Sequence, residues 1–476
     1  MPTTSASAPT PSAPSDLGAH DRPSTLAGPG GAAAPVRSRG RRRAVPVVLA
    51  VLVVAGLAVR VPMLSEQSGD YRAFLLPWYE HLAQAGGFAG LGDTFSNYDT
   101  PYLVLLAVLT YLPVDPLVGI KAISVVFDVL LALFAYGIVR EARPAARWLP
   151  VVAFGATFCL PTVVLNGAWW AQCDSVYASL CLGSLYLLLR RRTAAACVLF
   201  GLAFAFKLQA LFFLPALVVL VLVNRQRLRG LALVPVTFLA ALVPAWLAGR
   251  SLASQLSVYP SQVANPSGAG AGGGTARTGG GFGDGGSGRG GGGFGGGAPG
   301  GGPGAGGGGG TTSAHSFTSN APTWYSWLPA DASSTWKWVG LGVAAAVALA
   351  FAVWLLARRR RLAPAEMVLV AATLSLVVPL LLPEMHERYF YLGEVLAVVA
   401  VLVDRRFLVV AALMQVATLS TYWSYLRSTT VLDLETASVL ALAAAVAATA
   451  ILVLRLRRVP LEEPAAPVAS DGLTRA

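Results

Sequence analysis

The chain alternates between long apolar segments and short arginine-rich segments, and this alternation limits the folds that it can adopt. Seven arginine clusters separate the apolar segments. If each apolar segment crosses a membrane in the direction opposite to the one before it, all seven clusters face the same side. Arginine and lysine in short loops favour the cytoplasm, so the pattern predicts a multi-pass membrane protein.

Composition and charge agree with this prediction. Hydrophobic residues make up 55% of the 476 residues and charged residues 12%, which excludes a soluble domain of this size. The net charge of +12 lies mostly in the short arginine segments, so membrane orientation explains it better than nucleic-acid binding. Arginine far outnumbers lysine, and alanine, glycine and valine are abundant, which suggests a GC-rich genome such as that of an actinobacterium.

The predicted fold class is an all-α polytopic membrane protein. A membrane helix needs about 20 apolar residues, and residues 101–113 are too few to cross, so we expect a short helix there at the outer membrane surface. We predict about twelve transmembrane helices, with both termini in the cytoplasm and short juxtamembrane helices in the first outer loop. The predicted spans are 44–62, 118–139, 147–165, 174–190, 193–206, 208–223, 229–248, 337–357, 364–382, 388–403, 406–423 and 433–455.

Changes in composition along the chain predict its organisation. The N-terminal tail is rich in proline, serine, alanine and glycine, and cannot bury a core. An almost pure glycine run at 264–310 is expected to be a flexible, disordered tether. The expected regions are a disordered cytoplasmic tail (1–44), an N-terminal transmembrane catalytic module (45–249) with the first outer loop (63–117), an outer loop containing the glycine run (250–336), C-terminal transmembrane helices (337–457) and a cytoplasmic tail (458–476).

Several kinds of chemistry have no motif in this chain. Its four cysteines include no CxxC, so neither a disulfide framework nor a zinc site is indicated. No nucleophile motif, P-loop or metal-ligand spacing is present, which argues against an ATPase or a hydrolase. A group transfer that needs only a base and charge stabilisation remains, with no cofactor and no metal expected.

Asp70 lies a few residues beyond the first apolar segment. A carboxylate at that depth can act as a general base on a hydroxyl, because partial burial raises its basicity. Asp93, Asp99 and Asp115 share the same loop, and a solvated loop aspartate is the alternative interpretation of Asp70. Its closeness to the end of a span favours Asp70, since a lipid substrate would arrive there.

Ionisable residues also stand together at the boundary of a later span. His386, Glu387 and Arg388 follow an apolar segment, where charged groups are costly and therefore indicate function. Arg388 can bind a phosphate bidentately, an imidazolium at His386 adds charge near neutral pH, and Lys207 offers a second cation. Glu387 and Tyr389 are candidate sugar contacts. Helix capping is the alternative for the triplet, and a snorkelling side chain is the alternative for Lys207.

A third cluster combines indole rings with polar groups. It consists of Trp169, Trp170, Gln172 and Asp174. Proteins commonly bind sugars by stacking an aromatic ring on the apolar face of the sugar and by hydrogen-bonding its hydroxyls with carboxylates and amides. Interfacial tryptophans are equally ordinary at a membrane surface, so both interpretations stay open.

Taken in order, these segments resemble a known family. Asp70, NYDTPYL at 97–103, WWAQCDSVY at 169–177, FKLQALFFLP at 206–215 and MHERYFY at 385–391 together resemble the polyprenyl-phosphate-dependent GT-C glycosyltransferases. Within that group the chain looks most like bacterial mannosyltransferases related to the enzyme that adds the second mannose to GPI anchors. It is more distantly similar to dolichyl-phosphate-glucose glucosyltransferases. The resemblance spans about residues 45–455.

The resemblance implies an inverting, metal-independent hexosyltransferase of the bacterial plasma membrane, with its active site on the extracytoplasmic face. A sugar on a polyprenyl phosphate, with mannose the expected sugar, would be attacked by a hydroxyl of a glycan, lipid or protein acceptor. Asp70 would be the base, and Lys207, His386 and Arg388 would hold the lipid phosphate. The chain departs from the family pattern at Asp99-Thr100, where a proline is expected.

Two other classes of function remain open at this point. A transporter or lipid flippase commonly shows two related halves with broken helices, and no such repeat is evident here. A ligase or polymerase of the O-antigen type is also metal-free and outward-facing. In such enzymes the long outer loop comes late in the chain, whereas the candidate base here follows the first span.

Overall fold

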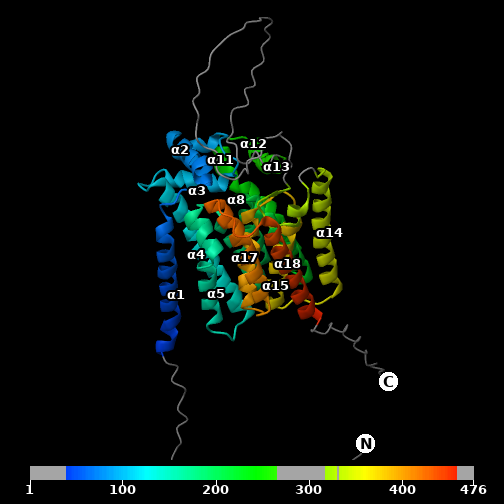
Figure 1. Ribbon diagram of the computed structural model, residues 1–476. Coiled ribbons are helices and arrows are strands. Elements are labelled where there is room, and N and C mark those ends of the chain that lie inside the picture. Colours follow the sequence, from blue (N-terminus) through cyan, green and yellow to red (C-terminus); the bar gives the residue numbers. More distant parts are fainter. Residues whose placement is uncertain (1–38, 265–316, 330–331, 458–476) are drawn as a thin grey trace, which may run out of the picture. The chain divides into compact units, whose positions relative to one another are not determined.

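The structure is a computed structural model that describes residues 39–264, 317–329 and 332–457. The predicted C-terminal tail and nearly all of the predicted N-terminal tail and glycine tether lie outside the described residues. Within them the chain is almost entirely helical, so the predicted all-α polytopic class is confirmed (Figure 1).

The helices begin and end close to the predicted span boundaries. Many of them start next to a proline, whose fixed φ suits the first helical turn. The first half of the described chain contains α1 (Arg39–Arg60), η1 (Val61–Met63), η2 (Tyr71–Leu75), α2 (Leu76–Gln84), η3 (Gly87–Gly92), α3 (Thr100–Leu109), α4 (Pro116–Ala142), α5 (Leu149–Phe158), α6 (Pro161–Val164), η4 (Leu165–Trp169), α7 (Asp174–Leu189), α8 (Thr193–Phe206), η5 (Leu208–Phe213), α9 (Leu214–Val223), η6 (Leu228–Ala232), α10 (Leu233–Ala241), α11 (Val243–Leu247), α12 (Leu252–Leu256) and α13 (Val258–Ala264).

The second half adds four longer helices, a shorter one, two 3₁₀ turns and two short strands. These are β1 (Thr318–Ser319), η8 (Trp324–Trp327), α14 (Thr335–Ala357), α15 (Pro364–Leu381), β2 (Met385–His386), η9 (Glu387–Phe390), α16 (Tyr391–Val401), α17 (Phe407–Arg427) and α18 (Leu434–Arg457).

The number of membrane crossings is lower than predicted when it is judged by helix length and composition. Within the described residues seven helices are long and apolar enough to cross a membrane, and the pair α5 and α6–η4, bent by 46°, makes an eighth. The helices α7, with 16 residues, and α8, with 14, are shorter than the roughly 20 residues of an ordinary span. The twelve-span count is therefore not confirmed.

The arginine-rich loops meet at one end of the bundle. The guanidinium of Arg143 donates a hydrogen bond to the carbonyl of Val403. Arg225 donates to the carbonyl of Arg359 over 3.3 Å, and Arg358 donates to that of Leu456 over 2.5 Å. Loops far apart in the sequence are thus joined by their own arginines. We call this the arginine end, and the opposite end, which carries the loop between α1 and α4, the site end.

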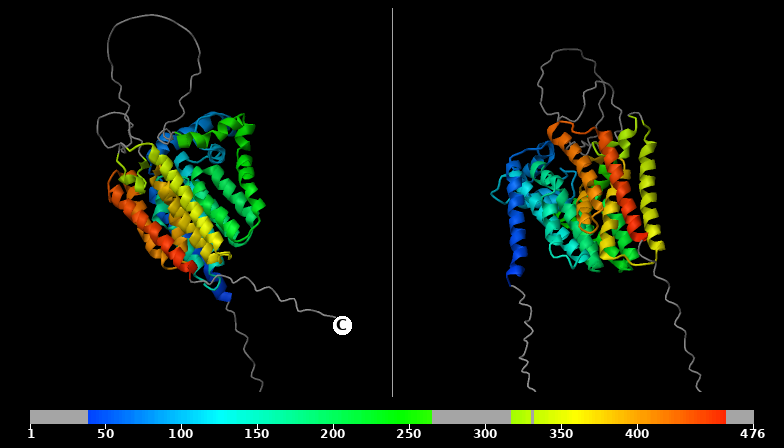
Figure 2. Two further views of the ribbon diagram at one scale, coloured as in Figure 1. Left: turned by 90° about the vertical axis from the view of Figure 1, so that its right-hand side faces the viewer. Right: turned by 60° about the horizontal axis from the view of Figure 1, so that its bottom comes forward.

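Two groups of helices build the bundle. In the first, α4 packs against α5 and α7, and α7 packs against α8, which in turn packs against α10. In the second, α15, α16, α17 and α18 pack successively, and α14 lies along α15 and α9 at the margin (Figure 2). One large apolar core runs through both groups, so α15 is buried along most of its length.

At the site end, short helices form a layer of their own. α2, η3, α3 and α11 pack around a separate apolar cluster that includes Trp78, Leu82 and Tyr102 (Figure 1). α3 has only 10 residues, so this segment does form the short helix expected near 101–113.

Two buried cations fasten the end of α1 and the chain that follows it to α4. The Nζ of Lys121 donates to the carbonyls of Met63 and Glu66 over 2.6 Å each. Arg60, at the end of α1, pairs with Asp128 at 2.8 Å. Lys121 and Asp128 therefore bond to partners on other segments and not to each other. These bonds fix the start of the loop that carries Asp70.

Candidate active site

Asp70 sits where two unusual helical turns meet. It directly precedes the π-helical turn η2, and the π-helical turn η4 ends next to Trp170. The Ser68 hydroxyl donates to the carbonyl of Trp170 over 2.6 Å and so joins the two segments. π-helical turns are rare and occur frequently at functional sites, because the inserted residue redirects the side chains that follow.

Three side chains donate hydrogen bonds to the Asp70 carboxylate. Trp170 Nε1 lies 3.0 Å from Oδ2, Gln172 Nε2 donates to the same oxygen, and the Tyr425 hydroxyl lies 2.7 Å from Oδ1. The guanidinium of Arg388 is 3.5 Å from Oδ2. The side chains of Asp70 and Arg388 each keep 16% exposure, so both can still reach a substrate.

The Trp170 ring fixes the position of these groups. It stacks on Tyr425 with ring centroids 4.3 Å apart, and the Arg388 guanidinium lies 5.4 Å from the ring centroid. Trp170 is fully buried, and Ala171 after it adopts a left-handed backbone with φ of 64°. That conformation is uncommon for a residue with a Cβ, and here it places Trp170 and Gln172 on the same carboxylate.

The segment containing Arg388 is held by the chain that follows the glycine run. β1 pairs in parallel with β2, with Ser319 opposite His386, and the Glu384 backbone N–H donates to the carbonyl of Phe317 over 2.7 Å. Asn320 bridges to the same strand and donates to the carbonyl of Thr421 on α17 over 3.1 Å. This short sheet orients Arg388 towards Asp70.

A second buried ion pair involves Lys207. Its Nζ lies 2.5 Å from Oδ1 of Asp174, and the side-chain exposures are 6% and 1%. Asn166 Nδ2 donates to the other oxygen of Asp174 over 2.8 Å, and the Tyr98 ring centroid is 5.7 Å from Nζ. Lys207 terminates α8, whereas Asp174 begins α7, so the pair joins two neighbouring helices at the site end.

Burial changes the charge states of His386 and Glu387. Burial, together with the neighbouring Arg388, lowers the pKa of His386 to about 3, so the ring is neutral at neutral pH and offers hydrogen bonds rather than the charge anticipated from the sequence. Burial raises the pKa of Glu387 to about 7, although Arg388 opposes this. Asp70, Lys207 and Arg388 all influence the pKa of His386, so these groups share one electrostatic environment.

The remaining candidates lie around this centre. Glu387 approaches Arg388 to 3.3 Å, and Tyr389 packs against Phe212 with centroids 6.0 Å apart. Trp169 instead packs with Arg427, whose guanidinium carbon lies 4.5 Å from its ring centroid. The structure therefore brings Asp70, Trp170, Gln172, Arg388 and Glu387 into one contact network, with Lys207 and Asp174 as an adjoining pair.

Sequence reasoning missed Tyr425 and Asn166. Tyr425 belongs to the segment TYWSYLR at the end of α17, where hydroxyl and aromatic groups interrupt an apolar helix. Such residues are common at membrane interfaces, so the pattern alone does not distinguish this tyrosine. Asn166 directly follows the predicted span 147–165, and the π-helical turn η4 brings it against Asp174.

No group of three or more His, Cys, Asp or Glu side chains in the part of the chain that the structure describes is arranged to hold a metal ion. Arg388 and Lys207 contribute cationic side chains to the described site.

Comparison with known proteins gives one family match. Residues 95–277 match the model of glycosyltransferase family 87, a segment that contains Trp170, Gln172, Asp174 and Lys207. A comparison with curated proteins finds no match. The family match, in a chain with several membrane-length apolar helices, indicates a glycosyltransferase in a membrane protein.

Proposed function

We propose that this protein is an inverting glycosyltransferase that moves a hexose, mannose in the first instance, from a polyprenyl-phosphate donor to an acceptor hydroxyl. The acceptor would be a cell-envelope glycan, a lipoglycan or a protein. The observation that carries the proposal is the Asp70 carboxylate, partly exposed, oriented by three donors and placed 3.5 Å from Arg388. A base beside a phosphate-binding cation is what this transfer needs.

Asp70 would accept the proton of the acceptor hydroxyl as the hydroxyl oxygen attacks C1 of the sugar. The bond between C1 and the phosphate oxygen breaks, and its electron pair leaves with the lipid phosphate. Attack opposite to the leaving group inverts the configuration in one step, through an oxocarbenium-like state. Phosphate is a good leaving group, so cations are enough to stabilise the charge that departs, and no second carboxylic acid is required.

Arg388 is the best placed group to meet the donor phosphate. Its guanidinium is shared between Asp70 and Glu387 and remains partly exposed, so a phosphate can compete for it. Lys207 is more buried and is held by Asp174, so it would act on the phosphate through the same network or after a shift of this pair. Neutral His386 would supply a hydrogen bond. We include metal independence in the proposal because Arg388 and Lys207 would supply the positive charge that the phosphate needs.

The position of the site at the helix ends supports a lipid-linked donor, because a polyprenyl chain stays in the membrane while its phosphate reaches the interface. Under the positive-inside rule we assign the arginine end to the cytoplasmic side. In this proposal the site end faces outward, so the active site of a GT-C-like bundle would lie on the extracytoplasmic face, with both termini in the cytoplasm.

The test is transfer by the purified protein in nanodiscs. Polyprenyl phosphates carrying radiolabelled mannose, glucose or arabinose are compared with the matching nucleotide sugars, each with and without EDTA, using membrane extract as the acceptor. We expect transfer from polyprenyl-phosphate mannose that EDTA does not abolish. Transfer from nucleotide sugars alone would contradict the donor class. A parallel assay with the protein in sealed vesicles follows the lipid, and its movement across the membrane without sugar transfer would instead indicate a flippase.

A further inference from the structure

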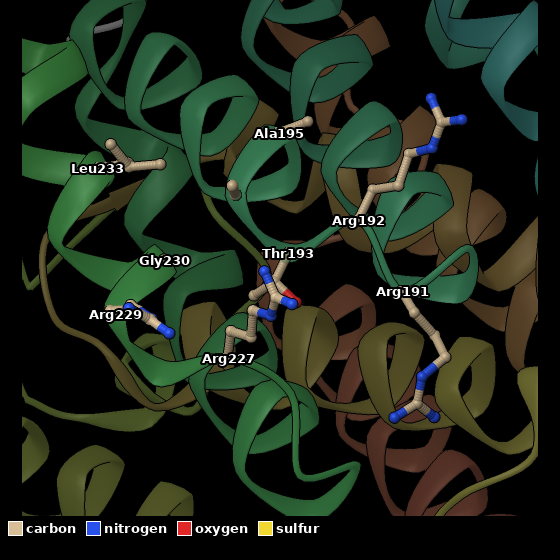
Figure 3. A pocket seen from close by; sticks show the side chains of 9 residues that line it. Arg191, Arg192, Thr193, Ala195, Arg227, Arg229, Gly230 and Leu233 are labelled. Carbon is tan, nitrogen blue, oxygen red and sulfur yellow. The ribbon is translucent and has the colours of Figure 1, made fainter.

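A pocket of about 790 Å³ lies at the arginine end, far along the helices from Asp70. Four arginines line it, namely Arg191, Arg192, Arg227 and Arg229. Figure 3 shows Arg191 and Arg192 on one side of the pocket and Arg227 and Arg229 on the other. The first pair comes from the turn between α7 and α8, and the second comes from the start of η6.

Buried polar contacts lock these two turns together. Thr193 Oγ1 donates to Oε1 of Gln226 over 2.6 Å, and Gln226 Nε2 donates to the carbonyl of Leu188 over 3.1 Å. Thr193 and Gln226 are both buried. Gly230 fits tightly against Thr193, since a Cβ at this glycine would lie 3.2 Å from the threonine methyl. The pocket is thus a built feature of the fold and not a gap between independent loops.

The positive charge of this pocket is not balanced within the described residues. At this end Glu141 pairs with Arg190, Glu366 with Arg360 and Asp404 with Arg406. None of these carboxylates, nor any other described one, forms an ion pair with the four pocket arginines. All four side chains are exposed. Four like charges around one hollow repel each other, and a bound anion would relieve that repulsion.

The surface next to the pocket is apolar and faces outward. Leu233, at the start of α10, forms part of the wall. Further along α10, Val236 is 57% exposed and Leu239 47%, and on the adjacent α8 Val198 is 38% exposed. These helices pack side by side. A molecule that binds the arginines can therefore continue along an apolar surface of the length and character that membrane lipid chains contact.

We propose that this pocket binds the phosphate of an anionic membrane phospholipid. Guanidinium groups match phosphate oxygens bidentately, and basic pockets between membrane helices suit lipid head groups. The adjoining apolar surface favours a lipid over a soluble phosphate, because a soluble anion would leave that surface unused. This site is separate from the donor-phosphate site at Arg388. The proposal does not depend on which sugar the enzyme transfers.

The test compares two double variants of the full-length protein. Arg227→Gln with Arg229→Gln removes two pocket charges, and Arg361→Gln with Arg405→Gln removes two exposed charges from the same end outside the pocket. Each protein is washed in detergent containing phosphatidylglycerol or phosphatidylcholine, and native mass spectrometry measures the lipid that stays bound. Thermal unfolding is followed in parallel with the same lipids and with glycerol phosphate.

We expect the unsubstituted protein and the control variant to retain phosphatidylglycerol over phosphatidylcholine, and the pocket variant to retain at least fivefold less. Phosphatidylglycerol should raise the unfolding temperature of the unsubstituted protein and of the control variant, but not that of the pocket variant. If both variants retained the same amount of phosphatidylglycerol, the pocket would not be the binding site. If glycerol phosphate raised the unfolding temperature as much as phosphatidylglycerol does, the ligand would be a soluble anion and not a lipid. Neither readout depends on sugar transfer, so the result is independent of the proposed activity.

Discussion

At the scale of single residues, the orientation of Asp70 depends on donors that come from distant parts of the chain. Trp170 and Gln172 follow η4, whereas Tyr425 ends α17. Each of these hydrogen bonds ends on a charged oxygen, and such bonds contribute more than bonds between neutral groups. The carboxylate is therefore held in one orientation before a substrate arrives.

Tyr425→Phe tests this orientation. The variant keeps the ring that stacks on Trp170 but loses the hydroxyl 2.7 Å from Asp70. We expect kcat to fall about 10- to 100-fold, the equivalent of one charge-assisted hydrogen bond, with little change in donor KM. Tyr111→Phe, which removes a hydroxyl bonded to Gly86 and Phe88 in the same layer, is the control. If kcat fell by a similar factor in both variants, the loss would come from a general disturbance of the short helices at the site end and not from the bond to Asp70.

Glu387 makes donor binding depend on pH. Burial raises its pKa to about 7, so it is mostly neutral below that pH and ionised above it. The ionised form competes with the donor phosphate for Arg388. Donor KM should therefore rise between pH 6 and pH 8 in the unsubstituted protein and stay nearly flat in Glu387→Gln. Parallel pH profiles for the two proteins would remove Glu387 from donor binding.

The sequence singled out most of the residues that the structure brings together, but not their pairings. Charged and amide groups such as Asp70, Gln172 and Arg388 stand out because they are costly next to a membrane. Tyr425 does not stand out, because tyrosine is ordinary at a membrane interface. The bond between Lys207 and Asp174 joins residues 33 positions apart on two helices, so it depends on packing that no local pattern contains.

At the scale of elements, the start of α3 shows how a departure from the family pattern is accommodated. Thr100, one of the two residues in place of the expected proline, donates from Oγ1 to Oε1 of Gln255 on α12 over 2.6 Å. Asp99 beside it is 1% exposed. Burial raises its pKa to about 7, and the nearby Arg250 guanidinium and Tyr259 hydroxyl offset only part of this. The helix start thus contains a carboxylate that folding makes harder to ionise.

Asp99 should make stability fall as pH rises. Its pKa in the folded protein lies above the ordinary value of 3.8, so the folded state binds the proton more tightly and is favoured at low pH. This stabilisation is lost between about pH 4 and pH 7 and can reach about 4 kcal/mol. From pH 5 to pH 8 we expect the unfolding temperature to drop more in the unsubstituted protein than in Asp99→Asn. Equal drops would show that Asp99 does not titrate in this range.

At the scale of the whole molecule, the sequence predicted the class of fold and the separation of two chemically different ends. Hydrophobic length and arginine placement were sufficient for this, because they reflect the membrane itself. They were not sufficient for the number of crossings. The segment α7 is buried along nearly its whole length by neighbouring helices, so it need not be as long as an isolated span.

The two ends predict opposite accessibility in cells. In a cysteine-free background, Asp93→Cys should react with a membrane-impermeant maleimide in intact cells, since Asp93 is exposed at the site end. Arg405→Cys at the arginine end should react only after permeabilisation. The reverse labelling pattern would show that the proposed active site faces the cytoplasm.

The most direct measurement is sugar transfer by Asp70→Asn in nanodiscs with polyprenyl-phosphate mannose, alongside Asp93→Asn as the matched carboxylate of the same loop. Asparagine keeps the size of the side chain but cannot take the proton of the acceptor. We expect Asp70→Asn to fold and bind the donor yet to lose at least about 10³-fold in kcat, with Asp93→Asn near the unsubstituted rate. Transfer by Asp70→Asn at a rate close to that of Asp93→Asn would show that Asp70 is not the base.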